Sequence, residues 1–110
     1  MALRFGAAGA AVVAAARADH ADAVVAEIRE AGGTAIPLSV DVTVGDQVAD
    51  MVRAALDEYG RIDVLVNNAG IVRDQLAMRM SQSDWDIVIA TNLTAVFTCS
   101  RAVLRPMLKQ

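Results

Sequence analysis

The sequence predicts an α/β domain with a parallel sheet, and three observations support that prediction. Segments of helical periodicity alternate with short apolar runs, in the order strand, helix, strand, helix, strand and long helix. The connections are short, as in right-handed crossovers between parallel strands. The chain has 110 residues, the size of one domain, and 55% of them are hydrophobic, which excludes a disordered chain.

The first half of the chain contains two predicted strands with a helix between them. A short apolar run over Ala10–Ala16 predicts the first strand. Apolar positions at helical spacing predict a helix over His20–Ala31, which two glycines end. Thr34–Val40 is the second predicted strand. Because Pro37 cannot donate a ladder hydrogen bond, we expect this strand at a sheet edge or a bulge.

The clearest predicted helix covers Thr43–Tyr59. Thr43 followed by Asp46 resembles a capping box, and Gly60 ends the apolar stripe. The next run, Ile62–Val66, is nearly all apolar, as expected of a parallel strand that is covered on both faces.

An Asn-Asn-Ala-Gly stretch at 67–70 ends the third predicted strand. Ser81 with Asp84 then opens another helical region, and a long helix runs to about Lys109. In such a sheet, ligands bind beyond the carboxyl ends of the strands. We therefore expect the functional residues after Ala16, around Asp41 and at 67–70.

Composition excludes several classes of function. A net charge of −3 argues against a nucleic-acid-binding protein. One cysteine, Cys99, and one histidine, His20, argue against a disulfide framework and against a metal site. Residues 4–16 imitate a weak signal peptide, so a small secreted protein stays open as an alternative. No apolar run reaches the length of a membrane span, and we expect a cytoplasmic protein.

The stretch Gly60–Gly70, GRIDVLVNNAG, resembles the fourth strand and following loop of the short-chain dehydrogenase/reductase family. The resemblance continues through Asp41-Val42-Thr43 before it and through Trp85–Leu93 after it. The stretches Ile71–Met80 and Ala102–Gln110 look like the branch that reduces 3-oxoacyl thioesters.

The resemblance implies a partial Rossmann-like doubly wound parallel sheet, with strands 2 to 4 of the family and their helices. Residues 1–110 would form a partial NADP-binding domain, with Ala2–Ala8 as the tail of the family's first helix. The family's Gly-rich phosphate turn has no counterpart, since a strand follows Gly6 and Gly9 where a phosphate loop opens a helix. We expect the chain to be poorly soluble, or Ala10–Ala16 to pair directly with Ile62–Val66.

The resemblance also implies a set of residues for the adenosine end of the cofactor. Arg17 stands where members that use NAD usually carry an acidic residue, which favours NADP(H) because a guanidinium pairs with a 2′-phosphate. A solvent-exposed Arg at a strand end is the alternative. Asp41 and Val42 resemble the adenine contact, although Asp41 also suits a helix N-terminus. The cofactor-loop contacts would come from Asn68, Ala69 and Gly70.

One catalytic residue of the family has a counterpart, Asn92, which in relatives disrupts its helix and holds a water. The family's catalytic Ser and its YxxxK motif do not: the only tyrosine, Tyr59, is followed by Gly-Arg-Ile-Asp. We therefore expect part of an NADPH-dependent reductase of 3-oxoacyl thioesters on acyl carrier protein or coenzyme A. The isolated chain would be inactive.

Other functions stay open. The chain could belong to another short-chain dehydrogenase, such as an acetoacetyl-CoA reductase or an alcohol dehydrogenase. It could also be a non-catalytic remnant that dimerises through the helix Ala95–Lys109, which belongs to the subunit interface in the family. We expect a homo-oligomer through this helix, and neither a nucleic-acid nor a membrane partner.

Overall fold

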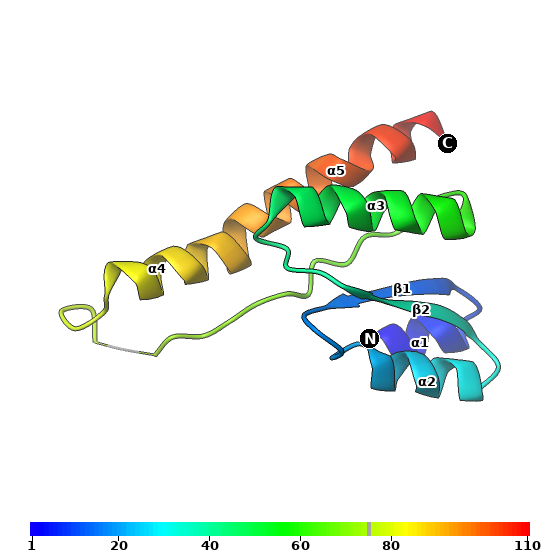
Figure 1. The fold of residues 1–110 in the computed structure, drawn as a ribbon, viewed down its shortest axis with the longest axis horizontal. Coiled ribbons are helices and arrows are strands. Elements are labelled where there is room, and N and C mark those ends of the chain that lie inside the picture. The colour runs from blue at the N-terminus through cyan, green and yellow to red at the C-terminus, as the bar shows by residue number, and fades with distance from the viewer. Residues whose placement is uncertain (75) are drawn as a thin grey trace.

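The computed structural model describes residues 1–74 and 76–110. The elements in chain order are α1 (Ala2–Ala7), β1 (Ala11–Ala16), α2 (Asp22–Glu30), β2 (Thr34–Ser39), α3 (Gly45–Tyr59), α4 (Gln82–Ile89), the π-helix η1 (Ala90–Thr94) and α5 (Ala95–Lys109). The last three follow one another without a break and form a single helix of 28 residues. Figure 1 shows this helix running along the whole upper side of the molecule.

The sheet of the described residues has two parallel strands, β1 and β2, in register from Ala11 opposite Thr34 to Ala16 opposite Ser39. α1 and α2 contact one face of the sheet, whereas α3 contacts β1 from the other face. α5 packs against α3. Figure 1 shows these layers. The predicted α/β class with a parallel sheet is confirmed.

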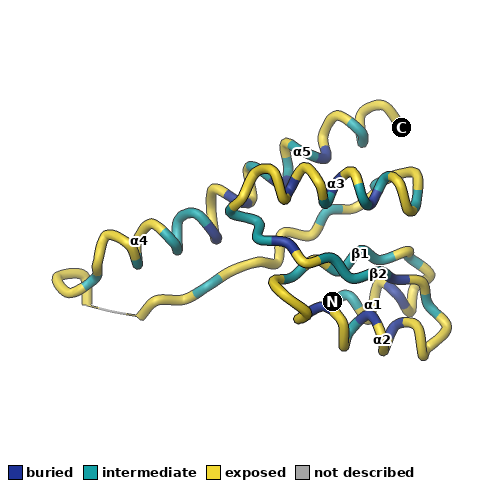
Figure 2. The backbone as a smooth tube through the Cα atoms, in the orientation of Figure 1, coloured by how far each residue is buried: buried dark blue, intermediate teal, exposed yellow. Residues whose placement is uncertain are grey.

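The core consists of two small parts on opposite faces of the sheet. Val25 and Ile28 of α2 pack with Ala35 of β2 on one face. On the other face, α3 contacts α5. The buried side chains of these two helices are Val48, Val52 and Ala55 of α3 and Ala95, Cys99 and Val103 of α5. Figure 2 shows the buried positions as short isolated stretches of the backbone.

Much apolar surface stays in contact with water. The accessible surface is 7503 Å², whereas a compact monomer of 11.6 kDa exposes about 5,800 Å². The radius of gyration is 15.5 Å, against about 13 Å for a compact domain of this length. The chain is therefore less compact than a domain of the same length and exposes more surface.

The predicted strand over Ile62–Val66 is wrong. The segment makes no strand hydrogen bonds, and Figure 1 shows the stretch from 61 to 74 as a drawn-out connection. Val64 and Val66 are 61% and 42% exposed, although the pattern predicts burial on both faces. The direct pairing expected between Ala10–Ala16 and Ile62–Val66 does not form either. An apolar run becomes a strand only where a neighbouring strand satisfies its backbone groups.

Two predictions about helix ends and one about the place of a strand in the sheet are confirmed. Gly60 ends α3 in the left-handed region, with φ of 79°, and its N–H donates to the Leu56 carbonyl at 2.8 Å. Ser81 caps α4, and its hydroxyl accepts from the Asp84 N–H at 3.0 Å. Pro37 lies in β2, which among residues 1–74 and 76–110 pairs with β1 alone and is therefore an edge strand.

The predicted capping box at Thr43 is wrong. The helix α3 begins at Gly45, and its N-cap residue Val44 makes no side-chain capping bond. The Thr43 hydroxyl donates instead to Asp41, two residues before it. A helix N-terminus presents N–H donors and needs an accepting oxygen at the N-cap position, which is held by Val44 and not by Thr43. Thr43 lies one residue before that position, and its hydroxyl makes a local bond to Asp41.

One helix in the described part of the chain is long and apolar enough to cross a membrane, judged by length and composition alone. It covers Gln82–Lys109, and its most apolar stretch of 18 residues has a mean hydropathy of 1.6. Core helices pass the same test, but they are mostly buried, whereas 22% of this apolar stretch is buried. The buried part includes Cys99 and Val103 of α5, which packs against α3.

Candidate functional site

Arg17 and Asp41 meet at the carboxyl ends of the two strands. Arg17 follows β1 directly, and Asp41 lies two residues beyond the end of β2. The Val40 N–H donates to the Ala16 carbonyl at 2.8 Å, which extends the strand pairing to the site. The Arg17 guanidinium lies 3.5 Å from Asp41 Oδ1, and the two side chains are 54% and 33% exposed. Both groups are therefore accessible to a ligand.

Thr43 fixes the carboxylate of Asp41. Its hydroxyl donates to Asp41 Oδ1 at 2.6 Å, and its N–H donates to the same oxygen at 3.0 Å. The Asp41 N–H donates in turn to Gln47 Oε1 at 2.7 Å. The two Thr43 donors and, at the longer distance of 3.5 Å, the Arg17 guanidinium thus meet at Oδ1. Oδ2 takes no hydrogen bond from residues 1–74 and 76–110.

The charge of Asp41 is favoured by these contacts. The hydroxyl and N–H of Thr43, and more weakly the Arg17 guanidinium, hold the pKa of Asp41 below its usual value, against the opposing effect of partial burial. The carboxylate is therefore ionised at neutral pH and can accept a hydrogen bond through its free oxygen.

The chain turns sharply just after Arg17. Ala18 has a positive φ of 49°, which is uncommon for a residue with a Cβ, and the His20 N–H donates to the Arg17 carbonyl at 3.1 Å. The turn fixes the direction in which Arg17 leaves the sheet. Alanine carries no sequence signal for this conformation, so the pattern could not predict it.

Asn92 lies in the π-helix η1 and makes two hydrogen bonds to a single residue. Its Oδ1 accepts from the Ile71 N–H at 2.8 Å, and its Nδ2 donates to the Ile71 carbonyl at 2.9 Å. The predicted local disruption of the helix at Asn92 is confirmed, because a π-helix replaces α-helical geometry there. Such π-helical turns occur frequently at functional sites.

The predicted cofactor loop lies next to Asn92. Asn68, Ala69 and Gly70 are exposed. A Cβ added at Gly70 would come within 3.5 Å of Asn92 Oδ1. Ala69 and Gly70 carry little or no side chain, so the backbone there is accessible to a ligand from the exposed side.

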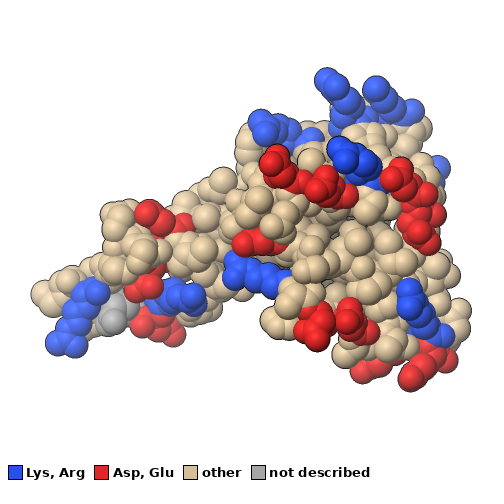
Figure 3. Space-filling view, in the orientation of Figure 1, with Lys and Arg blue, Asp and Glu red and all other residues tan. Residues whose placement is uncertain are grey.

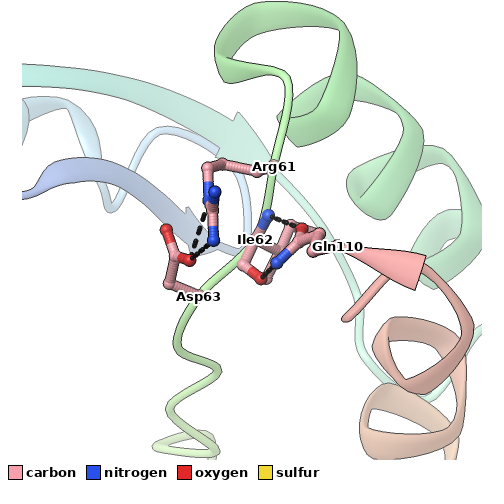
Figure 4. Close-up of polar contacts among 4 residues, drawn as sticks. All are labelled: Arg61, Ile62, Asp63 and Gln110. Carbon is pink, nitrogen blue, oxygen red and sulfur yellow. Dashed lines mark hydrogen bonds and ion pairs between the residues drawn. The ribbon is translucent and has the colours of Figure 1, made fainter. Parts of the chain in front are cut away.

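Gln110 repeats this contact at the other end of the segment. Its Oε1 accepts from the Ile62 N–H at 2.7 Å, and its Nε2 donates to the Ile62 carbonyl at 2.8 Å (Figure 4). Beside it, the Arg61 guanidinium donates to Asp63 at 2.9 and 2.6 Å. Asn92 and Gln110 thus satisfy backbone groups at both ends of segment 62–71, as neighbouring strands do in a sheet.

The sequence-predicted residues therefore form two groups. Arg17 and Asp41 are joined by their ion pair, with Val42 beside them in the chain, and the loop at 68–70 lies with Asn92. Within the described residues, none of these contacts joins one group to the other. Figure 3 shows acidic and basic side chains interspersed over this face of the molecule.

Sequence reasoning misses three residues that order these groups. The pattern assigns Thr43 to a helix cap and gives Gln47 and Gln110 no role. A Thr two residues after an Asp is a known local turn signal and could have indicated the first. Gln110 contacts Ile62, which lies 48 residues earlier, and no local pattern predicts such a pair.

Comparison with known proteins identifies the family. The family described as short chain dehydrogenase matches residues 1–110. A 3-oxoacyl-[acyl-carrier-protein] reductase from Synechocystis is 54% identical over 90 residues. A short-chain type dehydrogenase/reductase from Mycobacterium marinum is 41% identical over 99% of the chain, with a TM-score of 0.94. A metagenomic short-chain oxidoreductase, solved in complex with NADP, is 37% identical over 98% of the chain, with a TM-score of 0.93.

The chain spans 36% of the length of the Synechocystis relative, 44% of the Mycobacterium marinum structure and 50% of the metagenomic one. The match nevertheless extends over nearly the whole chain, including the segment at 62–71 that lacks a strand partner. The two-stranded parallel sheet with its helices is accordingly a partial Rossmann-like α/β unit. The chain belongs to the short-chain dehydrogenase family.

Proposed function

We propose that residues 1–110 form a partial NADP-binding domain and supply the adenosine end of an NADP(H) site. The observation that carries this proposal is the half-exposed Arg17 guanidinium at the carboxyl end of β1, beside a carboxylate with one free oxygen. A guanidinium pairs with a phosphate on the ribose 2′ position, whereas an acidic residue there would repel it. The metagenomic relative was solved with NADP.

The remaining contacts are those that the resemblance to the family implies, and the exposure of these groups is compatible with them. Asp41 would accept from the exocyclic amine of adenine through its free Oδ2, and Val42 would pack beside the ring. Asn68, Ala69 and Gly70 would place backbone against the cofactor, on the side that lacks bulky side chains. Arg17 as the donor and Asp41 as the acceptor would therefore suit a nucleotide that carries both an extra phosphate and an amine.

We propose further that the parent activity is NADPH-dependent reduction of 3-oxoacyl thioesters on acyl carrier protein or coenzyme A. The name of the Synechocystis relative supports this substrate class. The cofactor, when bound, supplies the hydride. Asn92 keeps the loop at 68–70 in place through Ile71 and would act in the proton path as the catalytic residue of this chain. The 110 residues hold no YxxxK motif, so alone they would not turn over substrate.

Binding of two small nucleotides tests the proposal without requiring turnover. The chain should bind 2′,5′-ADP more tightly than 5′-AMP, by calorimetric titration, because only the first carries the 2′-phosphate. Arg17→Gln should abolish this preference, whereas Arg53→Gln, which removes an exposed Arg that also pairs with an Asp, should keep it. Equal binding of both nucleotides by the unsubstituted chain would contradict the proposal.

We also propose that the protein is a cytoplasmic homo-oligomer that associates through α5. Four large exposed apolar side chains follow one another at spacings of 4, 7 and 4 residues: Leu93 at the end of η1, and Phe97, Leu104 and Leu108 of α5. These spacings put them on one face, and Arg101 covers the Phe97 ring at 5.2 Å. A stripe of this kind is typical of a contact with another helix.

Light scattering coupled to size exclusion tests the association. The unsubstituted chain should elute as a dimer or larger oligomer. Leu104→Glu should shift it to the monomer, because the new carboxylate would be buried without a partner at the contact. Glu58→Gln, an exposed change on another helix, should leave the oligomer intact. A monomer in the unsubstituted chain would contradict this proposal.

A further inference from the structure

Thr43, a residue between the second strand and α3, holds the carboxylate that faces Arg17. Its two donors lie 2.6 and 3.0 Å from Asp41 Oδ1, within the range of strong and ordinary hydrogen bonds. Arg17 approaches the same oxygen only to 3.5 Å. Thr43 therefore binds the Asp41 carboxylate more closely than Arg17 does.

This order of contacts leaves the Arg17 guanidinium only partly engaged. A carboxylate free to rotate would close on a neighbouring guanidinium and make two parallel hydrogen bonds with it. Held at Oδ1 by Thr43, Asp41 meets Arg17 at one nitrogen and at a longer distance. More than half of the Arg17 side chain stays exposed, so its remaining donors are open to another anion.

We propose that Thr43 is a positioning residue for nucleotide selectivity: by holding the Asp41 carboxylate, it keeps Arg17 available for a 2′-phosphate. Without the hydroxyl, only the longer bond from the Thr43 N–H would hold Oδ1, so Asp41 would turn more readily onto Arg17 and compete with the phosphate for the same donors. Thr43 itself touches no ligand and acts only through Asp41. This inference rests on the proposed NADP(H) site.

The test is the ratio of the dissociation constants for 5′-AMP and 2′,5′-ADP, measured on the 110-residue chain. Thr43→Val keeps the shape and removes the hydroxyl, and it should lower this ratio by about 3- to 20-fold. Thr43→Ser restores a hydroxyl and should restore the ratio. The control Thr34→Val changes an exposed strand residue and should leave the ratio unchanged.

A double-substitution cycle shows whether Thr43 acts through Asp41. In an Asp41→Asn background, Thr43→Val should lower the ratio no further, because the carboxylate that it restrains is gone. A further loss in that background would overturn the proposal, and so would an unchanged ratio in the single Thr43→Val chain.

The pKa of Asp41, measured by NMR titration without nucleotide, separates this proposal from the proposed function. The titration uses an Arg17→Gln background, because a guanidinium that closes on Asp41 would itself lower that pKa. In this background Thr43→Val should raise the pKa of Asp41, and Thr43→Ser should not. If the unsubstituted chain binds neither nucleotide, the proposed function fails, while the titration still tests the contact between Thr43 and Asp41. An unchanged pKa on adding Thr43→Val to Arg17→Gln would overturn the positioning role of the hydroxyl.

Discussion

Replacing Asn92 with Leu should release the segment that carries the cofactor loop. Asn92 makes two hydrogen bonds to the backbone of Ile71, at 2.8 and 2.9 Å. Each is worth about 0.5–1.5 kcal/mol net, so their loss costs roughly 1–3 kcal/mol. Leucine recovers about 0.5 kcal/mol through its better helix propensity. The expected net loss at this contact is therefore about 0.5–2.5 kcal/mol.

Hydrogen exchange at the Ile71 amide measures this loss directly. That amide donates to Asn92, so the substitution should speed its exchange by roughly 2- to 70-fold, at 1.36 kcal/mol per factor of ten. Asn92→Asp should give an intermediate rate, because a carboxylate still accepts from the Ile71 N–H but cannot donate to its carbonyl.

Two controls make the result specific. Asn68→Leu changes an exposed Asn of the same loop and should leave exchange at Ile71 as it was. The amide of Val25, in the buried part of α2, should exchange at the same rate in every variant unless the whole chain is destabilised. Unchanged exchange at Ile71 in the Asn92→Leu chain would mean that the contact between Asn92 and Ile71 contributes no free energy, and would contradict this prediction.

Three further predictions concern packing and ionisation. Gly33→Ala should destabilise the chain by about 1–3 kcal/mol in urea denaturation. The new Cβ would lie 2.7 Å from Ile28 Cγ2 and 3.1 Å from the Ile28 carbonyl oxygen. The control Gly45→Ala places a Cβ that meets nothing within 4 Å and should not destabilise the chain. Cys99 is 4% exposed and burial raises its pKa, so iodoacetamide should label it at least about tenfold more slowly in the folded chain than in urea, and equal rates would contradict this burial. The pKa of Asp41 is lowered in the folded chain, so the stabilising effect of its charge should be complete at neutral pH and be lost as the pH falls through the folded pKa. Asp41→Asn should therefore flatten the acid side of a plot of unfolding free energy against pH. An identical plot for both chains would argue against the Thr43 contacts.

The helices could be predicted well because their signals are local. The apolar stripe of α3 and its terminating glycine are both read within one stretch of chain, and Gly60 adopts the expected left-handed conformation. The serine cap of α4 is likewise local. Even the π-helix had a local signal in Asn92, a residue that competes for backbone hydrogen bonds.

The third strand could not be predicted in the same way. The apolar run Ile62–Val66 has the composition of a buried strand, but strand formation depends on a partner elsewhere in the chain. In the described residues, side-chain amides take part of that role, from Asn92 at Ile71 and from Gln110 at Ile62. These partners lie 21 and 48 residues away from the residues that they contact.

The residues of the candidate site could be predicted from the sequence only in part. Strand ends and the resemblance pointed to Arg17 and Asp41, and the structure brings the two within 3.5 Å. Thr43 gives both of its donors to Asp41, and α3 begins only at Gly45, with Val44 as its N-cap. The residue at which a helix begins shifts easily by one or two positions, so the local pattern could not tell a capping Thr43 from one that bonds to the preceding Asp.

The most direct test of the proposed site is an NMR map of backbone amide shifts on addition of NADPH to the labelled chain. The account predicts the largest changes at Arg17, at Asp41 and Val42, and along the loop 68–70 with Asn92. Changes concentrated instead around the shallow pocket lined by Met80 and Trp85, or none at saturating NADPH, would contradict it.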